Sequence, residues 1–443
     1  MANYTREDIL RIAEEEDVEF IRLQFTDIFG TMKNTAITFS RLEKALNNEC
    51  MIDVSSMEGF YRNGEDDLYL YPVLDTFCIL PWRPQQGKVA RLICDVYRAD
   101  GTPYKESPRY ILKQAKELAA AKGYTFQVNP ECEFFLFHTD DNGRPTTTTH
   151  EQAGYMDLSP VDLGENARRD IVLTMEDMGY DVASSHHEIA PAQHEIDFTM
   201  SDVLETADKF MTFKVAVRTV AKRHGLHATF MPKPKADVNG SGMHINMALY
   251  KEGKNVFADA SDPLNLSREG RAFIAGIFAH IEGMTAFFNP LVNSYKRLVP
   301  GFEAPSDITW SSTQRTALVK VCRNSRREQT IELRSPDPSA NPYLVFALCL
   351  AAGLRGIEAG LELSPELEKD LRKLSGEEKQ AQGIRSLPKN LDEALNKMEQ
   401  DPWIGQTLGS LYTEHYAKRK REEWENYSRQ VSEWELGQYL YRI

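Results

Sequence analysis

Three stretches of the sequence place acidic residues or histidine on one face of an expected strand. NPECEFFLF brings Glu131 and Glu133 to a shared face, because strand side chains alternate with a period of two. SSHHEIAPAQHEIDF supplies Glu188 and Glu195, and VNGSGMHINMALY sets His244 on the face opposite a row of apolar residues. Oxygen ligands with one imidazole suit Mg²⁺ or Mn²⁺ better than zinc. The spacing therefore predicts a divalent-cation site of the kind used by enzymes that act on phosphates.

A fourth stretch, EQTIELRSPDPSANPYL, adds a carboxylate and a guanidinium to this set. Glu332 and Arg334 lie two residues apart and share one side of an expected strand. Such a pair can hold a cation with one group and a substrate anion with the other. Arg297 and Arg315 add positive charge upstream. Mixed charge of this kind is what phosphoryl transfer requires.

The elements that must position these residues fall into two parts. Residues 5–16 predict a helix with Thr5 as N-cap, and residues 18–38 alternate as two strands joined around Gly30. Ser107 followed by a proline opens a further helix just after a turn. We therefore predict an N-terminal domain over 1–102 and a larger domain over 103–443, where strands and helices are mixed. The tail, residues 341–362 and 388–438, is predicted to be mainly helical.

Composition and charge exclude several classes of protein. A chain of 443 residues with 42% hydrophobic and 27% charged residues indicates a folded protein of two domains. No apolar run reaches the roughly 18 residues that span a bilayer, and the acidic N-terminus is no signal peptide. A net charge of −14 argues against direct nucleic-acid binding. The six cysteines show no CxxC spacing, which favours a reduced, cytoplasmic protein.

Beyond these residues, the chain resembles a type I glutamine synthetase along nearly its whole length. The shared motifs occur in the family's order: VSSMEGF, YLYP, ECEFFLF, SHHEIAPAQHEIDF, HGLHATFMPKP, NGSGMH, NSYKRLVPGFEAP and RSPDPSANPYL. The resemblance implies an α+β fold, with a small β-grasp-like domain and a large catalytic domain of antiparallel sheet and helices. It also implies a homo-dodecamer of two stacked hexameric rings, with active sites between neighbouring subunits. The short segment SGEEKQAQGIRSLPKNL is similar to the non-adenylylated subtype common in Gram-positive bacteria.

The resemblance also implies a role for individual residues. Glu131, Glu188 and Glu195, with Glu133 nearby, would hold one Mg²⁺ or Mn²⁺, and Glu131, His244 and Glu332 another, for two or three cations per site. The division of Glu131 and Glu133 between these cations stays open. The other implied assignments are glutamate binding by Asn239, Gly240, Arg297 and Arg334, closure of a loop by Glu303, ammonium binding and deprotonation by Asp53, a catalytic and nucleotide-binding role for Arg315, nucleotide binding by Arg323 and Arg326, and glutamine feedback through Arg62.

The implied reaction joins ammonia to glutamate at the expense of ATP, through γ-glutamyl phosphate. Two departures concern it: Ser325 and Thr330 stand where the family carries phosphate-binding arginines, and Val54 replaces a glycine whose backbone could need positive φ. The arginines at 323, 326 and 327 are displaced by one or two positions from those sites. Two alternatives therefore stay open, a ligase that uses an organic amine and a weakly active homologue with a regulatory role. The subtype also implies nitrogen-responsive repressors as partners.

The remaining histidines near the acidic stretches have a simpler interpretation. His186, His187 and His194 are interpreted as structural or hydrogen-bonding groups rather than as ligands. The arginines at 323, 326 and 327 are equally consistent with a solvated basic turn.

Overall fold

The small N-terminal domain is built on one mixed sheet. A computed structural model describes residues 3–60, 67–83, 86–321, 328–368, 371 and 374–443. In the small sheet the strands follow the order β2-β1-β6-β4-β3, with β5 also paired to β6. β1 and β6 run parallel, whereas the other pairs are antiparallel. The elements of this domain are α1 (Arg6–Glu15), β1 (Val18–Thr26), β2 (Met32–Thr38), η1 (Phe39–Arg41), α2 (Leu42–Leu46), β3 (Cys50–Asp53), β4 (Asp67–Pro72), η2 (Leu74–Thr76), β5 (Cys78–Ile79) and β6 (Lys88–Arg98).

Local sequence signals explain how this domain begins. The Thr5 side chain caps α1 by accepting a hydrogen bond from the Asp8 amide, and the Asp8 carboxylate accepts one from the Thr5 amide. The chain then alternates through β1 and β2 around the turn at Gly30, whose φ is +82°. Ile21 and Leu23 on β1 are fully buried in the core of this domain. The predicted helix and hairpin are confirmed.

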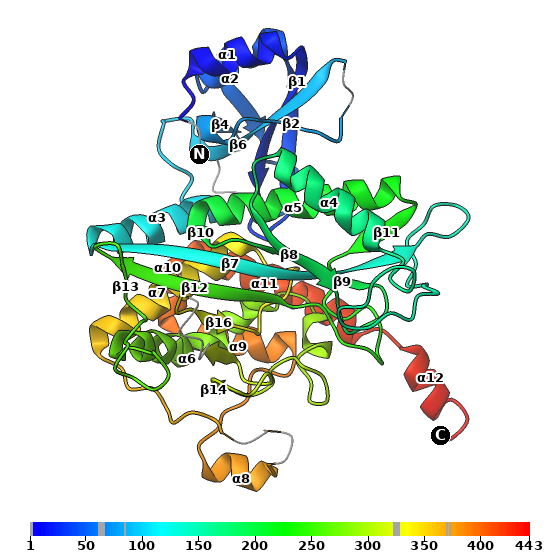
Figure 1. Ribbon diagram of the computed structural model, residues 1–443, viewed down its shortest axis with the longest axis vertical. Helices are drawn as coiled ribbons and strands as arrows, with labels where there is room; N and C mark the ends of the chain where they lie inside the picture. The colour runs from blue at the N-terminus through cyan, green and yellow to red at the C-terminus, as the bar shows by residue number, and fades with distance from the viewer. Residues whose placement is uncertain (1–2, 61–66, 84–85, 322–327, 369–370, 372–373) are drawn as a thin grey trace.

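The large domain is organised around a long, curved sheet that crosses the middle of the molecule (Figure 1). Its strands follow the order β14-β15-β16-β12-β7-β9-β8, with β10 and β11 paired to β7 and β13 to β12. All pairs are antiparallel except β14 with β15. The strands are β7 (Tyr124–His138), β8 (Val182–His187), β9 (Gln193–Phe198), β10 (Ser201–Asp202), β11 (Leu226–Thr229), β12 (Met243–Lys251), β13 (Lys254–Asn255), β14 (Trp310–Ser311), β15 (Val319–Val321) and β16 (Ile331–Leu333).

Helices bury the apolar face of this sheet. Phe126, Val128 and Phe134 of β7 join one large core with the helices, which leaves the alternate residues of β7 on the opposite face. The helices are α3 (Pro108–Ala121), α4 (Glu165–Asp177), α5 (Val203–Arg223), α6 (Arg268–Phe288), η3 (Ser294–Lys296), α7 (Pro342–Ala359), α8 (Gly376–Ala381), α9 (Leu391–Gln400), α10 (Pro402–Leu408), α11 (Ser410–Ser428) and α12 (Glu433–Tyr439). A small sheet domain and a large domain of mixed sheet and helices confirm the α+β prediction.

Two of these helices, α6 and α7, cross at close range because of paired glycines. A Cβ at Gly276 would lie 2.1 Å from the Ala352 carbonyl oxygen, and one at Gly356 would lie 2.1 Å from that of Ala272. Among the described residues, α7 is the one helix long and apolar enough by length and composition to cross a bilayer, with 18 residues of mean hydropathy 1.4, although Arg355 and Glu358 interrupt its apolar run. However, 72% of that stretch is buried inside the fold, as in the core helix of a compact protein.

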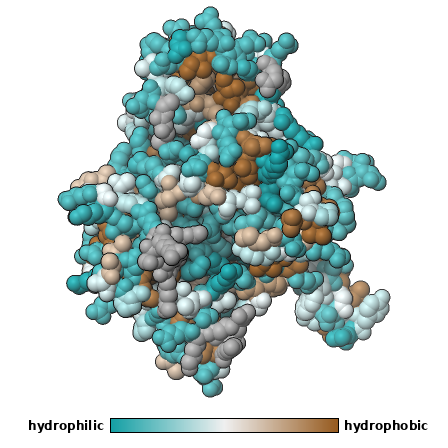
Figure 2. Space-filling model, in the orientation of Figure 1, coloured by the Kyte–Doolittle hydropathy of each residue, from teal (hydrophilic) through white to brown (hydrophobic). Residues whose placement is uncertain are grey.

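The C-terminal helix α12 projects from the body of the molecule (Figure 1). Trp434, Leu440 and Tyr441 near this end are 65%, 64% and 96% exposed. Hydrophobic side chains also reach the surface over the small domain, at the top of the view in Figure 2, where most of the remaining face is hydrophilic. Phe20 and Met51 are exposed large hydrophobic residues of that domain. Apolar surface of this kind is typical of a contact face between subunits.

Candidate active site

The polar face of the large sheet brings the first group of predicted ligands together. β7 and β12 pair so that His244 lies opposite Glu131, and β16 lies on the other side of β12. The Nδ1 atom of His244 is 3.6 Å from Glu131 Oε2 and 3.6 Å from Glu332 Oε1. The three residues offer ligand atoms that all lie within 4.8 Å of one another. The amide of Asn246 donates to Glu131 at 2.8 Å and so fixes the direction of that carboxylate.

A second group lies at the neighbouring strands β8 and β9. His186 Nδ1 is 3.7 Å from Glu188 Oε1, and His186 Nε2 is 3.7 Å from Glu195 Oε1. These three residues also meet within 4.8 Å. Glu188 occupies the turn that follows β8, and Glu195 is paired with Glu133 of β7. His186, interpreted from sequence as structural, is thus a candidate ligand that sequence reasoning set aside.

Glu133 lies between the two groups. Its Oε1 atom is 3.8 Å from His244 Nε2, and its Oε2 atom accepts hydrogen bonds of 2.9 Å from the Gln193 side chain and from the Gly242 amide. The expected set of Glu131, Glu188 and Glu195 is not among the groups that meet within 4.8 Å in the described part of the chain. Glu131 meets His244 and Glu332, which is the other set that the resemblance implies.

Burial and mutual repulsion govern the electrostatics of this face. Burial, followed by the nearby Glu188 carboxylate, raises the pKa of Glu133 to about 8. Burial likewise raises the pKa of Glu188, and with Asp197 it raises that of Glu195 well above its usual range. Burial and Arg334 hold the pKa of His244 well below its usual range, so the imidazole is neutral and can act as a ligand. So many buried carboxylates require positive charge, and the donors fit Mg²⁺ or Mn²⁺.

A narrow cleft joins these groups to the predicted substrate-binding residues. The volume of this cleft is about 30 Å³. Its lining includes these residues of the sequence prediction: Glu133, Glu188, Asn239, Gly240, His244, Arg297, Glu303 and Arg334. Phe302 and Ala304 complete it. One cleft therefore gathers carboxylates, an imidazole and two guanidiniums from elements far apart in the sequence.

Hydrogen bonds and an ion pair fix the positions of the two arginines of the cleft. Arg297, which is only 3% exposed, donates to the Ser335 carbonyl at 2.8 Å and to the Arg334 carbonyl at 3.0 Å. Arg334 forms a short ion pair with Glu332. At Gly240, which also lines the cleft, a Cβ would lie 2.3 Å from the Pro232 carbonyl oxygen. The packing of the chain on itself is therefore enough to require this glycine.

Other predicted residues lie outside the cleft. Asp53, at the end of β3 in the small domain, is exposed and accepts a hydrogen bond from the Ser55 amide at 2.7 Å. Arg315 is exposed in the loop before β15. Arg62, Arg323 and Arg326 lie outside the described residues, as do Ser325 and Arg327. The concern over Val54 is not supported, because Val54 has no positive φ and is buried in the small-domain core.

Sequence reasoning missed two residues beside the cation groups. The ring of Tyr155 lies 5.4 Å from that of His186, and burial, followed by Glu188 and Glu195, raises the Tyr155 pKa. Lys320 is opposite Glu332 in the β15–β16 pair, with its Nζ 3.4 Å from Glu332 Oε2. Alternation along VKV could have indicated Lys320, whereas the irregular loop around Tyr155 carries no periodic signal.

Two further features of the molecule do not belong to this cleft. One is a buried group whose composition could hold a metal, made of Glu151, Asp162, His187 and His194. The Arg168 guanidinium donates to both Asp162 and His194 and supplies the positive charge there.

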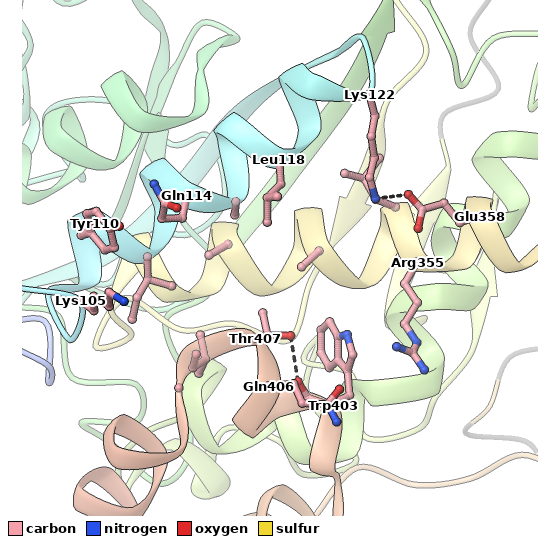
Figure 3. Close-up of a pocket in the computed structure, with 17 residues that line it drawn as sticks. Lys105, Tyr110, Gln114, Leu118, Lys122, Arg355, Glu358, Trp403, Gln406 and Thr407 are labelled. Atoms are coloured by element: carbon pink, nitrogen blue, oxygen red, sulfur yellow. Dashed lines mark hydrogen bonds and ion pairs between the residues drawn. The ribbon is translucent and has the colours of Figure 1, made fainter. Parts of the chain in front are cut away.

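The other is a larger cavity of about 580 Å³ between α3, α7 and α10. Figure 3 shows its mixed lining, in which Lys122 pairs with Glu358. None of the predicted site residues that the structure describes lines that cavity.

Comparisons with known proteins cover both domains. The glutamine synthetase β-grasp domain matches residues 17–99, and the glutamine synthetase catalytic domain matches residues 105–439. The chain is 55% identical over 440 residues to a glutamine synthetase of Clostridium saccharobutylicum, covering 99% of both chains. It is 50% identical to a glutamine synthetase of Staphylococcus aureus, covering 99% of this chain and 98% of that one.

Solved structures show the same architecture. A GmaS/ADP complex superposes with a TM-score of 0.87 and 32% identity, covering 98% of this chain and 99% of that one. The glutamine synthetase of Plasmodium falciparum superposes with a TM-score of 0.87 over 99% of both chains, and at 24% identity it supports the fold alone.

Proposed function

The chain belongs to the glutamine synthetase family, and we propose that it joins ammonia to L-glutamate with ATP, forming L-glutamine through γ-glutamyl phosphate. The observation that carries this proposal is the cleft itself. It gathers carboxylates suited to divalent cations and two buried arginines suited to a carboxylate substrate. Glutamate, ammonia and ATP are the substrates of the family.

The two groups of ligands would each hold one divalent cation, Mg²⁺ or Mn²⁺. Glu131, His244 and Glu332 would hold one, and His186, Glu188 and Glu195 the other, with Glu133 between them. Divalent cations bound there would neutralise the charge on phosphate oxygens during phosphoryl transfer. The two groups support a count of at least two cations per site.

The remaining residues of the cleft bind, orient and shield the substrate in this proposal. Arg297 and Arg334, with the backbone at Asn239 and Gly240, hold glutamate so that its side-chain carboxylate attacks ATP. Phe302, Glu303 and Ala304 line the narrow cleft, and in this proposal the segment that carries them opens to admit glutamate. Its return excludes water, which would hydrolyse the acyl phosphate.

Asp53 is proposed to bind ammonium and remove its proton in the cleft of a neighbouring subunit. Asp53 does not line the cleft of its own chain, and the small domain exposes Phe20 and Met51, which favours a contact with another copy. We extend this to a homo-dodecamer of two hexameric rings. Exposed Trp434 and Leu440 at the C-terminal end offer a second apolar contact.

The finer assignments follow from the resemblance and the relatives. The Clostridium and Staphylococcus relatives favour the non-adenylylated Gram-positive subtype and a cytoplasmic enzyme. Within this proposal Arg315, Arg323 and Arg326 bind the nucleotide, Arg62 mediates glutamine feedback, and nitrogen-responsive repressors bind the enzyme.

The proposal is tested by measuring phosphate and glutamine together. Purified protein with ATP, Mg²⁺, glutamate and ammonium is expected to release the two products in equal amounts. Glu332→Ala should abolish both, whereas Glu358→Ala, which removes a carboxylate beside the distant cavity of Figure 3, should retain both. Phosphate release with methylamine or a polyamine but not with ammonium would identify an organic-amine ligase instead. No release with any amine would refute a ligase altogether.

A further inference from the structure

A buried ion pair lies directly behind the turn that carries Glu188. The Nε2 atom of His187 is 2.7 Å from Glu151 Oε1, and the His187 and Glu151 side chains are 0% and 2% exposed. The other ring nitrogen, Nδ1, is 2.6 Å from the backbone carbonyl oxygen of Glu188. The imidazole therefore connects a buried carboxylate to the backbone of a proposed cation ligand.

The partners of His187 determine its protonation. A carboxylate and a carbonyl oxygen both accept hydrogen bonds, so both ring nitrogens must donate, and His187 is an imidazolium. The negative charge of Glu151 neutralises it. Removal of either partner would leave a buried charge without compensation and would destabilise the fold around it. The Glu151–His187 pair is therefore a buried, hydrogen-bonded contact next to the turn that carries Glu188.

Glu151 also holds the far end of the same turn. Its Oε1 atom accepts a short hydrogen bond from the Ala192 amide, and its Oε2 atom accepts one of 2.8 Å from the Leu163 amide. Ala192 has a φ of +67°, a left-handed conformation that a residue other than glycine adopts only when its surroundings hold it. Glu151 therefore anchors both residue 187 and residue 192, and Glu188 lies between them.

We propose that the Glu151–His187 pair is a positioning device that fixes the Glu188 carboxylate for its cation. The inference rests on the cation site of the proposed function. Glu151 and His187 touch neither substrate nor cation in this arrangement; they act through the backbone from Glu188 to Ala192. Loss of groups that orient a ligand typically weakens metal affinity by 10- to 100-fold.

The test measures cation binding directly, in the absence of ATP and glutamate. Mn²⁺ titrations of the metal-free enzyme, followed by electron paramagnetic resonance, give the affinity of each class of site. Glu151→Gln is expected to weaken one class by about tenfold or more and to leave the other unchanged. His187→Gln serves as a second variant, because it keeps a donor but loses the charge, and it should act in the same direction.

Asp208→Asn is the matched control. Asp208 is a buried carboxylate that pairs with Arg109 and accepts a bond from Tyr343, away from both cation groups. It should lower the melting temperature without changing Mn²⁺ affinity. The proposal is overturned if Glu151→Gln behaves in the same way, or if it weakens both classes equally.

A double-mutant cycle identifies the ligand through which the pair acts. The loss of affinity caused by Glu151→Gln should vanish in a Glu188→Ala background and persist in a Glu332→Ala background. Persistence of the effect without Glu188 would contradict the positioning role. Wild-type protein that binds no Mn²⁺ would instead refute the cation site and the proposed function, and the positioning role with them.

Discussion

Active sites shared between subunits make a quantitative prediction for mixtures of two inactive variants. Asp53 belongs to the small domain and does not line the cleft of its own chain, whereas Glu332 belongs to the cation group beside that cleft. Asp53→Ala removes a proposed general base, worth roughly 10²- to 10⁴-fold in rate. Glu332→Ala removes a cation ligand and should be inactive. Each variant alone is therefore expected to have almost no glutamine-forming activity.

Mixed oligomers of the two variants should recover activity. A working site needs an intact Glu332 in one chain and an intact Asp53 in its neighbour. At equal proportions each condition is met in half of the cases, so about a quarter of the wild-type activity should return. Activity should follow the product of the two fractions and peak at equal amounts.

The assay is glutamine formation by co-expressed, differently tagged chains, purified through both tags so that only mixed oligomers are measured. If Asp53 served its own chain, every subunit would carry one lesion and no mixture could exceed its parents. Confirmed mixed oligomers that remain inactive would refute the shared site.

Further predictions concern three single residues, Arg334, Lys214 and Gln193. Arg334→Gln should raise the KM for glutamate by roughly 10- to 100-fold, because a charge-assisted bond is worth about 1.5–3 kcal/mol; unchanged glutamate saturation would contradict its role. The same variant leaves Lys320 as the only cationic side chain paired with Glu332 in the described residues, so its melting temperature should fall more in EDTA than in Mg²⁺. Burial lowers the pKa of Lys214 to about 8 in the folded protein, from 10.5. Between these two pH values the unfolded chain binds more protons than the folded protein, so the free energy of unfolding should rise with pH. The rise in wild type should exceed that in Lys214→Met by roughly 3 kcal/mol. A pH-independent difference would contradict that shift. Gln193→Leu removes the side-chain amide that donates to the Glu133 carboxylate and to the Gly240 carbonyl. The free energy of unfolding in chemical denaturation should fall by about 1–3 kcal/mol, and glutamate binding should weaken. Wild-type stability together with wild-type glutamate affinity would contradict this role of Gln193.

The period-two pattern predicted much of the site because alternation survives folding. Glu131 and Glu133 share one face of β7, and His244 faces the same way on β12, as the sequence indicates. The cap at Thr5 and the hairpin after it depend on near neighbours and were equally readable. Such features are fixed by local geometry and need no knowledge of the rest of the chain.

Other parts of the site depend on partners that lie far away in the sequence. The separation of Glu131 from the Glu188 group follows from strand pairing, and Tyr155 reaches His186 from an irregular loop. The sequence predicted helix over 341–362, close to the observed α7, but the 72% burial of that helix depends on the segments that pack around it. No local pattern encodes these outcomes.

The sequence by itself determined which chemical groups are present and which strand faces carry them. Alternating side chains and turn signals act over a few residues, so they constrain the chain before any long-range contact forms. The tertiary structure decided which carboxylates share a cation group, and that an ion pair of Glu151 and His187 stands behind Glu188. It also left Asp53 outside the cleft of its own chain. These results depend on register and packing between distant segments, which only the complete fold specifies.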